Sequence, residues 1–296
     1  GLPSGLGIER VSPDGIPCDK VTTIFGLSGN FKTTLTSNLA WNIAAAGYPV
    51  LFISLEDSAR LEAQRLIARQ TGIGYGKLAA RQTDGTVSVS KDALATADRI
   101  IIADPGECTM NEVIRLAQYY KRTNGIKVVF LDYLQMLEGP RSQKDTLEDA
   151  MKRAMRMAVR DTVGFVMVSQ LVKTAAPERN REFGTNKLPE DMRPNIEDCF
   201  GSSAMRMCTK LGLGVFRPWK HVPVPHVTGA LGAYAKIAKV WPTGAADFLE
   251  NVYPRILEIG LSKNIIGEAP AVVHCLVELA TGKLEPLDLS AYAGLK

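Results

Sequence analysis

A loop near the start of the chain has the residue types and spacing of a cradle for nucleotide phosphates. The Walker A pattern G-x-x-x-x-G-K-[ST] is met by Gly26, Lys32 and Thr33, between a run of β-forming residues and an apolar-periodic segment. In such a loop backbone N–H groups point at phosphate oxygens, the lysine supplies a positive charge to the terminal phosphates, and the threonine hydroxyl binds Mg²⁺. The sixth position of the pattern holds Phe31 instead of Gly. Phenylalanine keeps its N–H donor, so we expect this change to cost conformational freedom rather than chemistry.

We therefore expect this loop to bind ATP together with Mg²⁺. Its binding residues are predicted to be Gly26, Ser28, Gly29, Asn30, Phe31, Lys32, Thr33 and Thr34. Gly29 allows the backbone to approach the phosphates closely. The match to the pattern is incomplete, however, and a chance Gly-Lys-Thr loop before a helix is the alternative.

Three further polar side chains stand at the ends of apolar, β-forming runs: Glu56, Asp132 and Gln170. In a parallel sheet the carboxyl ends of the strands meet at one edge, where ligands bind. Asp132 suits a Walker B carboxylate that holds Mg²⁺ together with Thr33. Glu56 suits a general base for the attacking water, and Gln170 suits a hydrogen-bond partner of that water or of the γ-phosphate. For any single carboxylate at a strand end, a cap on the next helix is the alternative.

The elements that must position these side chains alternate along the sequence. Strands are predicted at 21–26, 50–55, 99–103, 127–132 and 164–168, and helices at about 33–47, 58–70, 111–123 and 146–160. This alternation predicts an α/β fold with a mostly parallel central sheet flanked by helices. A further strand at 211–216 and a C-terminal antiparallel hairpin, at about 255–261 and 271–279, are predicted to follow. Residues 72–98 carry no pattern that decides their structure.

The 296 residues are consistent with one large α/β domain. Residues 1–20 are rich in Gly and Pro and form a predicted lead-in segment. A single domain is predicted for 21–296, with an insertion at about 218–254 that is rich in Pro and aromatic residues. The start without Met indicates a fragment or a trimmed chain.

Composition limits the class of protein. No run approaches the roughly 18 apolar residues of a membrane span, and the N-terminus lacks the basic and apolar regions of a secretory signal. Five scattered cysteines, odd in number and without metal-ligand spacing, indicate reduced thiols. We therefore expect no membrane partner and an intracellular location, in the cytoplasm or associated with the nucleoid. His221 and His226 lack partners at ligand spacing, so no metal site is expected there. The net charge of +4 permits a nucleic-acid partner, but only local clustering would argue for one.

Three motifs after the phosphate loop carry a family resemblance. They are Ser54-Leu55-Glu56, Asp132-Tyr133-Leu134-Gln135-Met136 and Ser169-Gln170-Leu171. In this order and spacing they resemble the motor domain of DnaB-type replicative DNA helicases. Residues 201–217 are similar to that family's segment after the second DNA loop, and 261–267 resembles the hairpin that reaches into a neighbouring subunit. The resemblance implies a RecA-like P-loop NTPase fold, a homohexameric ring and ATP-driven movement on single-stranded DNA. It also admits primase or loader proteins as partners.

The resemblance further implies DNA contacts on loops that line the central pore of the ring. The matching stretches are 138–145, 172–190 and 201–206. They contain the predicted DNA-binding residues Arg141, Lys144, Lys173, Arg179, Arg181, Ser202, Ser203 and Arg206. Loop cations and N–H groups suit contact with phosphates regardless of base sequence. Loops that are simply solvated are the alternative.

One departure from the family pattern concerns the hairpin that acts on a neighbouring subunit. Lys263 matches the lysine of that pattern, but Ile265 stands where the family has an arginine. An arginine finger can supply about 10³-fold or more in rate. We therefore expect Lys263 to act alone and hydrolysis to be weakened, or the arginine's role to lie elsewhere, with Arg217 and Arg255 as candidates.

Two rival functions stay open. One is a RecA-fold ATPase without unwinding activity, such as a helicase loader or a recombination or regulatory ATPase. The other is a catalytically weakened nucleotide-binding scaffold, to which Phe31 and Ile265 would point. Stimulation of hydrolysis by single-stranded DNA separates the motor from the first rival. Hydrolysis that is lost in Glu56→Gln while nucleotide binding is retained would reject the second.

Overall fold

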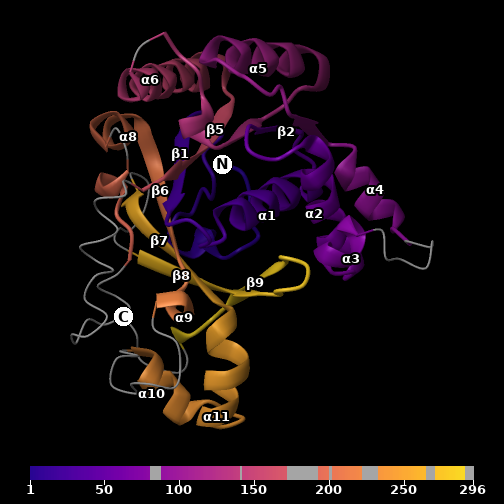
Figure 1. The fold of residues 1–296 in the computed structure, drawn as a ribbon, viewed down its shortest axis with the longest axis vertical. Coiled ribbons are helices and arrows are strands. Elements are labelled where there is room, and N and C mark those ends of the chain that lie inside the picture. Colours follow the sequence, from indigo (N-terminus) through magenta and orange to yellow (C-terminus); the bar gives the residue numbers. More distant parts are fainter. Residues whose placement is uncertain are drawn as a thin grey trace.

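The computed structural model describes residues 1–80, 88–140, 142–171, 193–199, 202–221, 233–264 and 271–290. Within these ranges one sheet contains nine strands. The strands are β1 (Val21–Gly26), β2 (Val50–Ser54), β3 (Ile100–Ala103), β4 (Val128–Asp132), β5 (Gly164–Gln170), β6 (Thr209–Phe216), β7 (Ile256–Asn264), β8 (Ala271–Val277) and β9 (Leu284–Leu287). They lie in the order β3-β2-β4-β5-β1-β6-β7-β8-β9 (Figure 1).

The predicted α/β fold is confirmed. The first six strands of the chain pair in parallel, and β7, β8 and β9 continue the sheet in antiparallel pairing. Every residue of β1, β2 and β4 is buried, as expected of parallel strands covered on both faces. The C-terminal hairpin is present as β7 and β8, and β9 extends it beyond the prediction.

The main helices are α1 (Lys32–Ala45), α2 (Ala59–Thr71), α5 (Met110–Asn124), α6 (Gln143–Asp161) and α8 (Ser202–Cys208). Shorter helices are α3 (Tyr75–Ala79), α4 (Lys91–Ala97), α9 (Pro218–His221), α10 (Ala233–Val240) and α11 (Ala245–Asp247). Local signals set several ends: Ser58 accepts from the N–H of Leu61 at the start of α2, and Gly125 ends α5 in the left-handed conformation. Among the described residues no helix combines the length and apolar character needed to cross a membrane.

Alternating residues of the central strands supply the two hydrophobic cores on either side of the sheet. Phe25 of β1 packs in a cluster with apolar residues of α5, α6 and α8. Its neighbour Ile24 packs on the opposite face with residues of α1 and of 1–20. The predicted lead-in segment contributes Leu2, Leu6, Ile8 and Ile16 to this second core. The division into a lead-in segment and a domain of 21–296 stays a prediction.

The described part of the predicted insertion at 218–254 forms a third, smaller hydrophobic cluster. The insertion contains α9, α10 and α11. The cluster is built on residues of α10 and of 248–253, and its core includes Tyr234, Phe248 and Tyr253. Tyr234 donates its hydroxyl to Glu258, a fully buried carboxylate on β7 that also pairs with Arg193. Polar contacts therefore tie α10 to the sheet. Figure 1 shows α10 and α11 at the opposite end of the molecule from α5 and α6.

Candidate nucleotide-binding site

Parallel register brings the predicted catalytic groups to one edge of the sheet. Gly26 at the end of β1 pairs with Gln170 at the end of β5. The N–H of Leu55, just after β2, donates to the carbonyl of Asp132 at the end of β4, at 2.7 Å. Glu56 follows immediately on the same turn. The phosphate loop leaves β1 at this same edge, so the sequence motifs converge on it.

Lys32 lies inside the phosphate loop. Its Nζ donates to the carbonyls of Gly26 and Leu27 at 3.0 and 3.1 Å, and its side chain is largely buried. Burial lowers the pKa of Lys32, against the raising effect of the nearby Asp132 and Glu56 carboxylates. This buried ammonium donates to neutral carbonyls. A negatively charged phosphate oxygen would be a stronger hydrogen-bond acceptor for it.

Phe31 stands where the Walker A pattern has glycine, and its backbone adopts a conformation that favours glycine. Its φ of 63° lies in the left-handed region, as does the φ of 71° at Gly29. For a residue with a Cβ this conformation costs about 1–2 kcal/mol. The Phe31 ring packs against the core beside α1, and the Arg217 guanidinium lies 4.0 Å from the ring centroid. These contacts offset part of the backbone cost, and the loop keeps its N–H donors.

Asp132 and Thr33 offer the oxygen ligands that Mg²⁺ prefers. The Thr33 side chain is hydrogen-bonded to the Asp132 carboxylate, which is 3 % exposed. Burial raises the pKa of Asp132 to about 6, against the lowering effect of the Thr33 hydrogen bond. Its Oδ2 is buried without a hydrogen-bond partner in the described part of the chain. A hydroxyl beside an unpartnered carboxylate oxygen fits a magnesium ion that is shared with phosphate oxygens.

Gln135 fixes the position of Gln170, a role that the motif alone did not assign. Gln135 Nε2 donates to Ser169 Oγ at 2.9 Å, and the N–H of Gln170 donates to Gln135 Oε1 at 3.2 Å. The Tyr133 side chain is hydrogen-bonded to the Gln170 side chain. The signal available in the sequence was that polar residues follow two apolar runs, which the structure pairs as β4 and β5.

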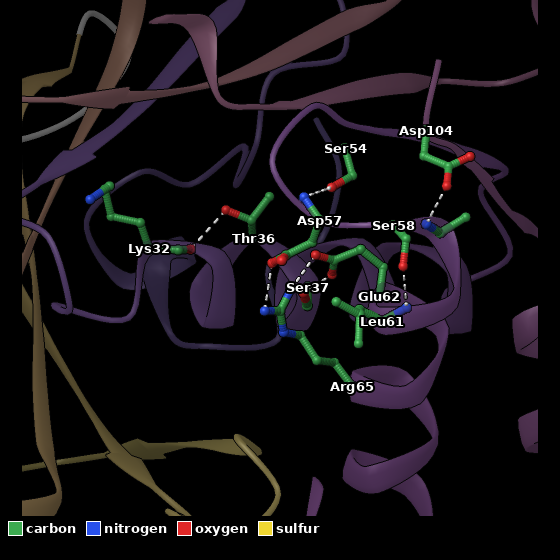
Figure 2. Close-up of polar contacts among 11 residues, drawn as sticks. Lys32, Thr36, Ser37, Ser54, Asp57, Ser58, Leu61, Glu62, Arg65 and Asp104 are labelled. Carbon is green, nitrogen blue, oxygen red and sulfur yellow. Dashed lines mark hydrogen bonds and ion pairs between the residues drawn. The ribbon is translucent and has the colours of Figure 1, made fainter. Parts of the chain in front are cut away.

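The sequence patterns did not predict Glu62, a buried carboxylate beside the site. Glu62 on α2 is 2 % exposed, accepts from Arg65, and accepts from Ser37 Oγ on α1 at 3.4 Å. Arg65 in turn donates to Asp57 at 2.7 Å (Figure 2). Burial raises the pKa of Glu62 to about 7, with Arg65 opposing it and Asp132 adding to it. No sequence signal marks Glu62, because its burial depends on how α2 packs against α1.

Glu62→Gln should change the pH dependence of stability. The folded protein holds a proton on Glu62 up to about pH 7, whereas the unfolded chain releases it near the ordinary carboxyl pKa of 4.5. The unfolded state thus binds fewer protons in this window, and the Glu62 contribution to stability falls as pH rises from about 4.5 to about 7. The difference in unfolding free energy between Glu62→Gln and the parent should shift in favour of the variant by roughly 2–3 kcal/mol between pH 5 and 8.

Urea unfolding of both proteins at pH 5, 6, 7 and 8 measures this difference. Glu250→Gln, at an exposed carboxylate in the insertion, is the control and should follow the parent at every pH. A difference for Glu62→Gln that stays constant with pH would contradict the assignment of the proton to Glu62.

Residues 4–193 match the family model of the DnaB-like helicase C terminal domain. The chain belongs to this family. A replicative DNA helicase DnaB from Buchnera aphidicola subsp. Acyrthosiphon pisum is 29% identical over 226 residues, which is 73% of this chain and 47% of the relative. The DnaB of Haemophilus influenzae is 30% identical over 153 residues, 48% of this chain and 33% of the relative. The chain thus spans between a third and about half of the length of these relatives.

Two solved structures share the fold of this DnaB-family chain. A DnaB-like replicative helicase, described with its interactions with primase, superposes with a TM-score of 0.75 at 20% identity over 97% of this chain and 64% of the other. A solved ATPase domain superposes with a TM-score of 0.74 at 20% identity over 97% of this chain and 92% of the other. Together with the sheet and its phosphate loop, these matches confirm the RecA-like P-loop fold predicted from the DnaB resemblance.

The stretches that the DnaB resemblance assigns to DNA lie partly outside the described residues. Those outside are Arg141, Lys173, Arg179 and Arg181, and Ile265 of the hairpin lies outside as well. Two loop predictions were wrong. Lys144 lies in the first turn of α6, because Ser142 Oγ caps that helix by accepting from the N–H of Asp145. Ser202, Ser203 and Arg206 lie on α8 rather than on a loop, because α8 buries apolar residues against α6.

The DnaB-type hairpin lysine lies away from the phosphate loop of its own chain. β7 runs antiparallel to β6, and Lys263 sits opposite Gly212 toward the edge where the parallel strands begin. Its Nζ donates to the carbonyl of Arg206 just before β6. Of the two candidate substitutes for the hairpin arginine, Arg217 lies against the phosphate loop at Phe31. Arg255 instead donates to the carbonyl of Val277, at 3.0 Å, and pairs with Glu278.

Proposed function

We propose that this chain is the ATP-hydrolysing motor domain of a DnaB-like replicative helicase, which moves along single-stranded DNA as a ring. The observation that carries this proposal is the Asp132 carboxylate, which is buried against Thr33 and has one oxygen without a hydrogen-bond partner among the described residues. It lies at the sheet edge that also presents Lys32, Glu56 and Gln170. Membership of the DnaB-like family supports the same assignment.

Each residue at this edge has a role in the proposed reaction. Loop N–H groups and Lys32 bind the phosphates. Thr33 and Asp132 would hold Mg²⁺, which would supply positive charge to the phosphates. Glu56, which is exposed at the end of its turn, accepts a proton from water as that water attacks the γ-phosphorus. The bond to the β–γ bridging oxygen breaks, and ADP leaves. Gln170 hydrogen-bonds the water or the γ-phosphate from β5.

The proposed ring assigns Lys263 to the nucleotide of a neighbouring copy. Its contact with the carbonyl of Arg206, away from its own phosphate loop, supports an action between subunits. A homohexamer, with single-stranded DNA in its pore, follows from the family resemblance. The predicted DNA-binding residues belong to this part of the proposal, as does a cytoplasmic location. A primase is named for one solved relative, and a primase or loader is proposed as a partner here.

An ATPase that does not unwind DNA is the second candidate function. The departures at Phe31 and Ile265 point instead to the other alternative, a catalytically weakened nucleotide-binding scaffold. The nucleotide site itself is the same for a motor and for an ATPase that does not unwind DNA. The two functions differ in their response to single-stranded DNA, since a motor couples hydrolysis to its track.

Native mass measured with and without Mg·ATP and single-stranded DNA tests the ring. A ring motor should form a closed oligomer, hexameric by the family resemblance, that is favoured by nucleotide and DNA. Lys263 would then stand at the boundary between subunits. A chain that stays monomeric under all four conditions would contradict the proposed ring and the role of Lys263 in it.

A further inference from the structure

A basic segment after β6 lies on the phosphate loop, and no motif accounts for it. β6 pairs in parallel with β1, so the chain leaves both strands at the same edge of the sheet. Residues 217–221, which include α9, then cover the loop that follows β1. Three contacts join them: Arg217 over the Phe31 ring, Lys220 to the carbonyl of Ser28, and His221 to Asn30. The segment thus contacts the middle of the loop at successive points.

Lys220 reaches the backbone of the loop through the space left by a glycine. Its Nζ donates to the carbonyl of Ser28 at 2.6 Å. The same Nζ lies 2.6 Å from the point where a Cβ on Gly29 would stand, so any side chain there would clash with the amine. Because Gly29 has no side chain, the Lys220 amine can contact the loop backbone, which in the Walker A pattern binds phosphate. The Lys220 side chain is exposed, so a ligand can reach it.

His221 anchors this segment without adding charge. Its ring stacks on Phe216 with centroids 4.9 Å apart and is 6 % exposed. Burial lowers the pKa of His221 to about 4, so its ring is neutral at pH 7, and its Nε2 lies 3.4 Å from Asn30 Nδ2. His221 therefore holds the segment in place without adding a positive charge that would repel the Lys220 ammonium at neutral pH.

The two cations that reach the loop from 217–221 have no carboxylate bonded to them in the described part of the chain. Within the described ranges the Lys220 amine contacts a carbonyl oxygen rather than a carboxylate, and the buried Nε of Arg217 has no hydrogen-bond partner. Burial and Arg217 lower the pKa of Lys220, and Lys220 in turn contributes to the lowered pKa of Lys32. A bound polyphosphate would replace the Ser28 carbonyl, as the partner of Lys220, by a charged acceptor. It would also relieve the repulsion among Lys32, Arg217 and Lys220.

We propose that Lys220 is a second phosphate-binding lysine, which contacts the phosphate chain of the bound nucleotide from the same subunit. This inference rests on the proposed nucleotide site and adds a residue to it. In the structure the amine is bonded to the Ser28 carbonyl, and it moves to a phosphate oxygen when nucleotide binds. Lys220 thereby supplies from within the chain a positive charge near the phosphates, where the family pattern relies on an arginine at the position of Ile265.

Calorimetry in the presence of Mg²⁺ tests the proposal. It measures the affinities of the parent and of Lys220→Met for ATP, ADP and adenosine. Loss of a charge-assisted hydrogen bond should weaken ATP binding by about 10- to 100-fold. ADP binding should weaken as well, adenosine binding should stay unchanged, and Lys220→Arg should recover most of the loss. Lys236→Met, at an exposed lysine of α10, is the control and should bind like the parent.

The outcomes separate the two proposals. ATP binding to Lys220→Met with the affinity of the parent would overturn the role of Lys220 and leave the nucleotide site intact. A parent that does not bind ATP would overturn both. If Lys220 only holds the loop through the Ser28 carbonyl, the uncharged donor of Lys220→Gln should keep ATP binding at the parent affinity, which also overturns the proposal. Thermal unfolding checks that the variant is folded. Lys220→Gln, which keeps a donor for the Ser28 carbonyl, replaces Lys220→Met if that variant unfolds.

Discussion

Glu56→Gln is expected to lower the rate of ATP hydrolysis by about 10²- to 10⁴-fold, the usual contribution of a general base. ATP binding should change little, because Gln keeps the shape of the side chain and the phosphate loop is untouched. Glu56 is exposed at the end of its turn, so the substitution disturbs no buried contact. Steady-state release of phosphate measures the rate, and calorimetry measures ATP affinity. Glu250→Gln, at an exposed carboxylate of the insertion, should hydrolyse ATP like the parent.

This substitution also separates an enzyme from a nucleotide-binding scaffold. Loss of hydrolysis with retained binding rejects the scaffold, because a scaffold has no turnover to lose. A Glu56→Gln variant that hydrolyses ATP at the rate of the parent would contradict the role of Glu56 as the base. Absence of turnover in the parent would support the scaffold instead.

The second large effect is expected for Lys32→Met, which should lower the rate of hydrolysis by about 10²- to 10³-fold and weaken ATP binding. The Lys32 ammonium is held inside the loop by the carbonyls of Gly26 and Leu27. It is therefore positioned before nucleotide arrives and needs little rearrangement to meet negative charge on the phosphates. Methionine keeps the length of the side chain and removes the charge. Phosphate release and calorimetry again provide the measurements.

Lys127→Met is a matched control for this experiment. Lys127 is exposed just before β4, at the edge of the same sheet where the parallel strands begin, opposite the phosphate loop. It should leave hydrolysis unchanged. Hydrolysis by a folded Lys32→Met at the parent rate would contradict the assignment of the phosphate loop.

The parts of the site that follow strand ends were predictable from the sequence. Buried parallel strands are near-continuous apolar runs, so Asp132 stands out as the polar residue that ends one. The parallel sheet then brings Asp132, Glu56 and Gln170 to one edge whatever the lateral order of the strands. That geometric rule placed the central groups of the candidate site correctly.

The rest depended on lateral order and packing, which local patterns do not encode. The position of Lys220 on the phosphate loop required β6 to lie beside β1. The sequence around Glu62 is that of an ordinary helix, and Glu62 is buried because α2 packs against α1. The predicted loop at 201–206 failed for a similar reason, because α8 is stabilised by its contact with α6. Residues 72–98 carry no pattern that decides their structure, and α3 and α4 lie within that range.

The rate of ATP hydrolysis with and without single-stranded DNA tests the proposed motor most directly. The parent, saturated with Mg·ATP, should hydrolyse ATP faster when single-stranded DNA is added, and duplex DNA of equal length should have less effect. The stimulation should disappear in Glu56→Gln. A parent that hydrolyses ATP at the same rate with and without single-stranded DNA would contradict the motor and favour an ATPase that does not move on DNA.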